Sequence, residues 1–109
     1  MILRREDYEE KAMPEFKGGI GELNARMITD ENGKILFGRL KPGNSIGLHT
    51  HDTSSEIIYI LEGEADYIYD GKEEKAVAGN AHYCPKGHSH CMTNNGDKDL
   101  VFFAVIPEQ

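Results

Sequence analysis

Two histidines, His49 and His51, stand two residues apart near the middle of the chain. Residues i and i+2 of a β-strand point to the same face of the sheet, so the two imidazoles are expected to lie side by side. Glu56 follows five residues after His51, and His90 lies much further along. Imidazole nitrogens together with a carboxylate oxygen suit a divalent transition metal. The sequence therefore predicts a metal site built from these four residues.

This set of donors restricts the metal and its chemistry. Three neutral nitrogens and one carboxylate oxygen are typical of sites for Fe(II), Mn(II), Ni(II), Zn(II) or Co(II), whereas Ca(II) and Mg(II) prefer oxygen ligands. Four protein ligands leave up to two octahedral positions for water, dioxygen or a chelating anion. The ion would act as a Lewis acid, or as a redox centre if it is iron. We expect one divalent transition metal as the cofactor.

Length and charge limit the class of protein. The 109 residues are enough for one domain with a modest core. The formal net charge of −7 argues against binding to nucleic acid or to anionic membranes, which attract basic proteins. No run approaches the roughly 18 apolar residues of a membrane span, and residues 1–7 lack the apolar region of a signal peptide. We expect a cytoplasmic protein whose partner is a small molecule.

The chain has two cysteines, Cys84 and Cys91, only seven residues apart and outside any CxxC motif. Without a secretory signal we expect no disulfide between them. Two small thiols, buried or half-buried, are the expected state. A thiol lining the site is the alternative.

Strand signals dominate from Leu23 onward. Asn32-Gly33 stands between two apolar runs and predicts a hairpin with a type I′ turn, in which both turn residues have positive φ. Asp70-Gly71 marks a second hairpin of the same kind. About eight or nine short strands follow one another at the spacing typical of sandwiches and barrels. The predicted fold class is all-β, either a jelly roll or a small antiparallel barrel.

The first 21 residues have a different character. Residues 4–13 are mostly charged and predict a short helix that Pro14 ends. The glycines between residues 18 and 21 predict a flexible break. We expect residues 1–21 to form a short N-terminal arm, packed on a partner subunit, and residues 22–109 to form the domain.

The strand expected over residues 56–62 predicts an interface. If Glu56 points inward, Ile58 does too, and Ile57, Tyr59 and Leu61 point outward. Three apolar side chains on an outer face need cover from a second sheet or another subunit. This pattern predicts a homodimer. The same alternation places His90 on one face of its strand and Cys91 on the other.

Three other polar residues have two possible roles each. His88 is a candidate general base at the mouth of the site, or a loop histidine in solvent. His82 is expected to be structural or on the surface. Arg39 could clamp a carboxylate in the cavity or form an external salt bridge. No arrangement of a nucleophile with a base is evident.

Two longer patterns resemble the motifs of the cupin family. The first is Gly43-x5-His49-x-His51-x4-Glu56-x6-Gly63, and the second is Gly79-x5-Pro85-x-Gly87-x2-His90-x3-Asn94. Five fixed positions match by chance on the order of once in a million starts. Position 80 is Asn, whereas many cupins have Asp there. Asn retains a side chain that can form the turn but carries no charge.

The resemblance has specific implications. It implies a conical double-stranded β-helix of two antiparallel sheets, a cupin-type jelly-roll barrel, with a metal bound by His49, His51, Glu56 and His90. It also implies frequent dimers. Small cupins include dioxygenases, decarboxylases, isomerases, lyases and sugar-binding or regulatory domains.

These implications leave the reaction open. We expect a metal-dependent enzyme, an oxidoreductase or one of the other small-cupin types, acting on a small polar or anionic molecule. The alternatives are a non-catalytic module that binds or senses a sugar or anion, and a metal that only stabilises the fold. Activity of the oxalate-decarboxylase type would need an acid on a mobile lid, and no residue of the sequence marks one.

Overall fold

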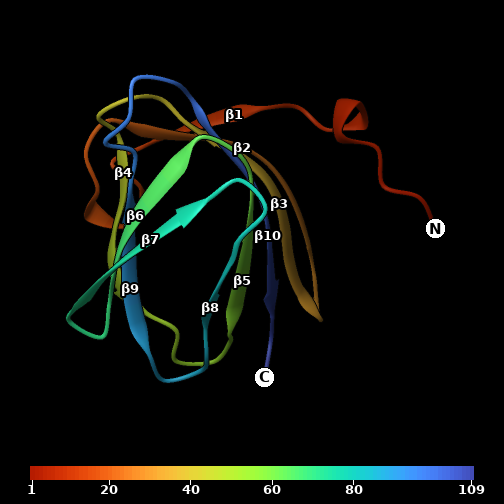
Figure 1. Cartoon of the computed structure of the whole chain (residues 1–109). Helices are drawn as coiled ribbons and strands as arrows, with labels where there is room; N and C mark the ends of the chain where they lie inside the picture. Colours follow the sequence, from red (N-terminus) through yellow and green to blue (C-terminus); the bar gives the residue numbers. More distant parts are fainter.

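The computed structural model describes all 109 residues as two antiparallel β-sheets that face each other (Figure 1). One sheet has six strands in the order β1-β2-β3-β10-β5-β8, and the other has four in the order β4-β9-β6-β7. The strands are β1 Lys11–Pro14, β2 Glu22–Asp30, β3 Gly33–Leu40, β4 Ser45–Thr50, β5 Glu56–Glu62, β6 Glu64–Tyr69, β7 Lys72–Val77, β8 Ala81–Cys84, β9 Ser89–Thr93 and β10 Leu100–Pro107. Two single 3-10 turns, η1 Arg5–Asp7 and η2 Phe16–Gly18, are the helical elements, and neither is long and apolar enough to cross a membrane. The predicted all-β jelly roll is confirmed.

The hydrophobic core lies between the sheets and consists of alternate residues of the strands. On β5, Ile58 and Ile60 are buried, whereas Ile57, Tyr59 and Leu61 remain 44 %, 43 % and 49 % exposed. The predicted alternation of this strand is therefore confirmed. The largest buried apolar side chains of the core are Leu23, Leu36, Leu40, Ile46, Ile58, Ile60, Tyr67, Met92, Leu100 and Phe102.

The hairpin between β2 and β3 forms as expected, but its turn differs from the prediction. Asp30 pairs with Gly33, so Glu31 and Asn32 are the turn residues, and Asn32 does not have a positive φ. The Asp30 carboxylate accepts a hydrogen bond from the backbone N–H of Asn32 at 2.8 Å. This hydrogen bond between a carboxylate and a backbone N–H two residues on favours a turn at Glu31-Asn32 over the type I′ turn predicted at Asn32-Gly33.

The hairpin between β6 and β7 has the turn that the sequence predicts. Asp70 and Gly71 connect the strands with φ angles of 47° and 81°, both positive as a type I′ turn requires. Asp is one of the few residues other than Gly that adopt this left-handed conformation, and contacts with β9 hold its side chain here. Its carboxylate accepts the backbone N–H of Ser89 at 3.0 Å.

The helix predicted over residues 4–13 is wrong. The segment forms only the single turn η1, and Lys11–Pro14 instead pairs with β2 as the edge strand of the larger sheet. Pro14 is tolerated there because an edge strand does not need every N–H. Pairing with β2 therefore outweighs the local charge pattern. The chain before β1 extends away from the barrel (Figure 1).

Close backbone packing explains two glycines near this arm. A Cβ added to Gly19 would lie 2.1 Å from the carbonyl oxygen of Ser45, and one added to Gly47 would lie 2.1 Å from that of Lys17. Only glycine permits this approach of η2 to β4. The chain at Gly19 therefore packs closely on β4, which holds Phe16 and Lys17 beside the site.

Candidate metal site

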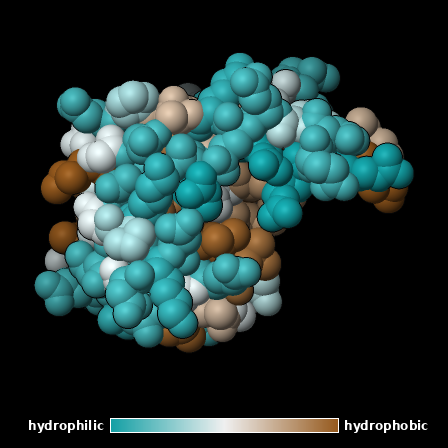
Figure 2. All heavy atoms as spheres, turned by 90° about the horizontal axis from the view of Figure 1, so that it is seen from above, coloured by the Kyte–Doolittle hydropathy of each residue, from teal (hydrophilic) through white to brown (hydrophobic).

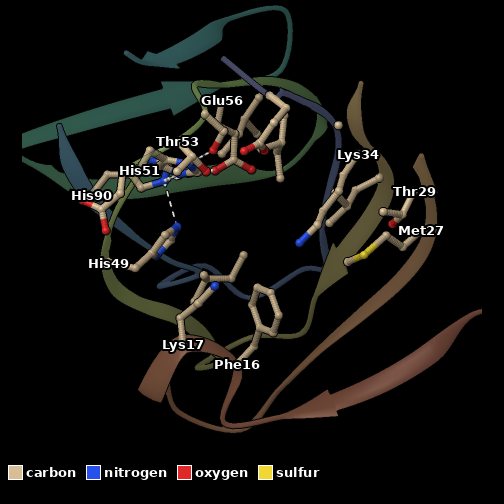
Figure 3. Close-up of a pocket in the computed structure, with 18 of the residues that line it drawn as sticks. Phe16, Lys17, Met27, Thr29, Lys34, His49, His51, Thr53, Glu56 and His90 are labelled. Carbon is tan, nitrogen blue, oxygen red and sulfur yellow. Dashed lines mark hydrogen bonds and ion pairs between the residues drawn. The ribbon is translucent and has the colours of Figure 1, made fainter. Parts of the chain in front are cut away.

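The four predicted ligands come together at one wall of the barrel, and we call them the donor cluster (Figure 3). His49 lies on β4 directly opposite His90 of β9, so strand pairing brings these two together. His51 follows the end of β4, and Glu56 opens β5 in the other sheet. The donor atoms of all four lie within 4.8 Å of one another.

The distances within the donor cluster fit a metal ion. Nε2 of His90 lies 3.0 Å from Oε1 of Glu56 and 3.0 Å from Nε2 of His51. It also lies 3.2 Å from Nε2 of His49, and the His51 and Glu56 donors are 3.1 Å apart. Neighbouring donors on an ion with bonds of about 2.1 Å are about 3 Å apart when the bonds meet at right angles. The donor spacing is therefore that of ligands around one ion.

The protonation states also favour a cation. Burial alone would raise the pKa of Glu56, but hydrogen bonds and charge interactions with His51 and His90 outweigh it and lower the pKa to about 2. Glu56 is therefore a carboxylate at neutral pH. Burial lowers the pKa of His49, so that its imidazole is neutral and has a lone pair to offer. These are the forms in which both groups bind metals.

Each histidine of the donor cluster is held through its other ring nitrogen. Nδ1 of His49 lies 2.7 Å from the carbonyl oxygen of Gly47. This oxygen can only accept, so Nδ1 carries the proton and Nε2 presents its lone pair to the site. Nδ1 of His51 lies 3.0 Å from Oγ of Ser54, a group that can donate or accept. Such contacts orient metal-binding histidines.

The third histidine is held by a residue that the sequence did not place at the site. Nδ1 of His90 lies 3.0 Å from Nε2 of His82, which is buried. Of the two alternatives expected for His82, a structural role or a surface position, its burial supports the structural role. Burial alternates along β8, so His82 and Cys84 point inward while Tyr83 is exposed.

A cavity of about 550 Å³ opens beside the donor cluster. Phe16 and Lys17 of η2 line one side, and Met27 and Lys34 line the wall opposite the histidines (Figure 3). The ammonium group of Lys34 points into the cavity (Figure 3). This volume lies within the range of small-molecule sites, about 300 to 1,000 Å³. Sequence reasoning missed these lining residues because sequence distance does not show which strands face each other.

Two predicted accessory residues lie elsewhere. The His88 ring pairs with Asp70 and stacks on Tyr69, and His88 is not among the residues that line the cavity. The structure therefore does not support a general-base role for it. Arg39 forms salt bridges with Glu10 at 2.6 Å and with Asp99 at 3.2 Å, which confirms the external alternative.

Asn94, the last fixed residue of the second motif, is structural, and the two thiols are in the expected state. The Asn94 amide donates to the backbone oxygens of Leu40 and Lys98, both at 2.8 Å, and so fixes a loop. Cys84 and Cys91 are free, the first buried and the second half-buried.

Comparisons with known proteins agree with this geometry. The family model described as "Cupin domain" matches residues 36–106. A protein of Thermotoga maritima named "Oxalate-binding protein" is 38 % identical over 112 residues, covering 97 % of this chain and 93 % of the relative. The "Germin-like protein subfamily 2 member 1" of Arabidopsis thaliana is 30 % identical over 73 residues, which are 62 % of this chain and 33 % of that protein.

A solved structure gives the same fold over the whole chain. It is the crystal structure of a predicted oxalate decarboxylase from Thermotoga maritima, with a TM-score of 0.93, 31 % identity and full coverage of both chains. The family match spans the donor cluster and both cupin motifs, and the fold match spans both sheets. On this evidence the chain belongs to the cupin family.

Proposed function

We propose that this cupin binds one divalent transition-metal ion at the donor cluster and a small carboxylate anion, of the oxalate class, through that ion. The observation that carries the proposal is the convergence of three imidazole nitrogens and one carboxylate oxygen on the wall of an open cavity. The name of the Thermotoga maritima relative supports this ligand class. The bound ion would supply a Lewis acid with positions free for a chelating anion.

The cavity contributes groups suited to such a ligand. Lys34 and Lys17 both line it, and neither takes part in a salt bridge. The ammonium of Lys34 is therefore available to pair with a carboxylate on the side away from the metal. Exposed acidic residues also line the cavity, namely Asp30, Glu31, Asp52 and Glu108. The preference for an anionic ligand must therefore come from the metal ion and from these two lysines.

Metal analysis combined with calorimetry tests this function. Protein purified without added metal is analysed for its elements and then titrated with oxalate before and after treatment with a chelator. We expect about one ion per chain, oxalate binding only with metal, and loss of both in the Glu56→Ala variant. Asp52→Ala, at an exposed acidic residue of the cavity, is the matched control and should retain the metal. Oxalate binding that is unchanged after chelation would contradict the proposal.

Catalysis is the second candidate. A cavity of about 550 Å³ leaves space around the donor cluster for a substrate larger than oxalate. This space favours a metal-dependent enzyme of the decarboxylase, lyase or dioxygenase type acting on a small anionic molecule. The test incubates metal-loaded protein with oxalate and with diketones, thiols and uronates, with and without dioxygen. Product formation that Glu56→Ala abolishes would support turnover, whereas tight oxalate binding without product would support a binding protein.

We also propose that the protein forms a homodimer through the outer face of β5, with residues 1–21 as an arm appended to the domain of residues 22–109. Ile57, Tyr59 and Leu61 supply an exposed apolar surface on this face. The part of this arm that precedes β1 stands out from the body and has a hydrophobic tip, where Met1 and Ile2 are fully or largely exposed (Figure 2). Both features fit contact with a second copy.

A further inference from the structure

We propose that the ligand of this site is a 2-oxo acid with an aromatic side chain. Its chelating end lies at the donor cluster, and its ring packs on an apolar wall of the same cavity. The inference rests on the proposed function, because it takes the carboxylate end of the ligand to be held by the metal ion. Three half-buried side chains, Phe16, Met27 and Ile106, form this apolar wall.

The apolar wall is built from three separate parts of the chain. Phe16 belongs to η2, Met27 to β2 and Ile106 to β10. Each side chain packs against the hydrophobic core and also lines the cavity, so none of the three is fully buried. Figure 3 shows Phe16 and Met27 pointing into the cavity from sides that the donor cluster does not occupy. Apolar surface of this kind favours binding of a ligand that removes it from water.

Core residues continue the apolar wall into the interior. Ile58, Met92 and Phe102 also line the cavity, and each is at most 2 % exposed. They belong to the hydrophobic core against which the apolar wall packs. A hydrocarbon group that lies here therefore contacts carbon from the wall and from the core behind it.

The cavity has space for a ligand that extends beyond the chelating end. Its volume of about 550 Å³ is more than the two carboxylate groups of oxalate fill. Oxalate has no hydrocarbon part, so it would leave the apolar wall in contact with water. A 2-oxo acid presents the same chelating unit, a carboxylate oxygen and an oxygen on the adjacent carbon. It has a side chain in place of the second carboxylate, and this side chain can cover the wall.

The residue types of the apolar wall favour an aromatic side chain on the ligand. The Phe16 ring offers a partner for offset or edge-to-face stacking. The thioether of Met27 makes favourable contacts with aromatic rings, and its unbranched chain adapts to the shape of a ligand. The wall therefore matches a planar ring better than a second charged group.

The backbone is strained on both sides of Phe16. Glu15 and Lys17 have φ angles of 50° and 56°, in the left-handed region that residues with a side chain rarely adopt. Two hydrogen bonds hold this turn. The N–H of Glu15 donates to the carbonyl oxygen of Gly21 at 2.8 Å, and the N–H of Gly18 donates to that of Glu15 at 2.9 Å. Strained residues of this kind cluster at ligand sites, and here the strained turn places the Phe16 ring at the cavity.

Calorimetry with two matched acids tests the inference. Zinc-loaded protein is titrated with 2-oxobutanoate and with 2-oxo-4-phenylbutanoate, which differ only by a phenyl group. We expect the phenyl group to raise the affinity by at least about 10-fold, as added hydrocarbon does in an apolar pocket. Met27→Gln makes the wall polar at similar volume and should remove most of this gain. Equal affinities for the two acids would overturn the inference.

Met13→Gln is the matched control for the Met27 variant. Met13 is also half-buried against the hydrophobic core, but it does not line the cavity. The ratio of the two affinities should therefore be retained in this variant. An equal loss of the ratio in Met27→Gln and Met13→Gln would also overturn the inference.

Methyl NMR of the four methionines gives a second measurement that does not depend on affinity. The ring current of bound 2-oxo-4-phenylbutanoate should shift the methyl signal of Met27 and leave that of Met13 in place. At saturation 2-oxobutanoate should shift the Met27 signal much less. An unshifted Met27 signal with the phenyl acid bound would place the ring elsewhere and overturn the inference.

The outcomes separate this inference from the proposed function. If the zinc-loaded protein binds neither oxalate nor the two acids, the proposed function fails and the inference fails with it. If oxalate binds only with metal and the phenyl group adds no affinity, the proposed function stands and the inference alone fails. Tighter binding of 2-oxopentanedioate, a dicarboxylate that would pair with Lys34, than of the phenyl acid would likewise overturn the inference.

Discussion

At the scale of single residues, each histidine of the donor cluster depends on a partner outside it. His51 differs from His49 in its partner: the Ser54 hydroxyl can donate or accept, whereas the Gly47 carbonyl can only accept and so fixes the tautomer of His49. Ser54 contributes orientation instead, through a contact of 3.0 Å that is shielded from solvent.

Ser54→Ala should weaken metal binding without unfolding the protein. The change removes the contact to His51 and lets its ring rotate, so the expected loss of metal affinity is about 10-fold. Thr53→Ala, at the exposed neighbouring position, should leave the affinity unchanged. Titration of both variants with zinc against a competing chelator measures the difference. Equal affinities would show that Ser54 does not orient His51.

The two thiols should react at very different rates. Burial raises the pKa of the Cys84 thiol to about 11, whereas Cys91 is half-buried. The thiolate is the nucleophile, so a buried thiol of high pKa reacts slowly with alkylating reagents. Mass spectrometry after iodoacetamide treatment near pH 8 should find Cys91 modified and Cys84 unmodified. Cys91→Ser should abolish labelling of the folded protein, and rapid labelling of Cys84 would contradict its burial.

At the scale of elements, the site depends on the contact between η2 and β4. Gly47→Ala would place a methyl group 2.1 Å from the carbonyl oxygen of Lys17, so η2 must move away. Overpacking of this kind costs about 1–3 kcal/mol in the free energy of unfolding. Leu48→Ala, at an exposed side chain of the same strand, should cost less than about 0.5 kcal/mol. Urea denaturation of both variants measures the difference, and equal stabilities would contradict the close packing.

At the scale of the whole molecule, the donor cluster joins the two sheets. Glu56 comes from the six-stranded sheet, whereas His49 and His90 come from the four-stranded sheet. A ligand that binds only the folded state stabilises it, by about 2.7 kcal/mol at a free concentration 100 times its dissociation constant. Chelation should therefore lower the melting temperature of the metal-loaded protein. The Glu56→Ala variant should melt at the same temperature with and without chelator, and a chelator effect in that variant would point to metal bound elsewhere.

The prediction of a homodimer rests on the exposed outer face of the six-stranded sheet. Tyr59→Lys places a charge in the middle of the exposed apolar row of β5 and should convert the expected dimer to a monomer. Ile68→Lys, at an exposed apolar position on the other sheet, should leave the dimer intact. Light scattering after size exclusion gives the mass of each variant. A single-chain mass for the unaltered protein would contradict the homodimer.

The sequence by itself was sufficient for the all-β class, for the inward and outward residues of β5, and for the donor cluster. Alternation and motif spacing are local properties, and a period of two residues determines which side chains share a face. The same local reasoning was wrong for the turn at Asn32 and for the helix over residues 4–13, because Asp30 and β2 offered competing hydrogen bonds.

Tertiary structure alone decided what surrounds the metal position. The register of β4 against β9 set His49 opposite His90, and the packing of β8 and β7 put His82 and Glu74 behind it. The approach of η2 and the facing of the two sheets formed the cavity and turned Lys34 toward it. Contacts of this kind join residues far apart in the chain, and they depend on how whole strands pair and pack, which no local pattern of residues encodes.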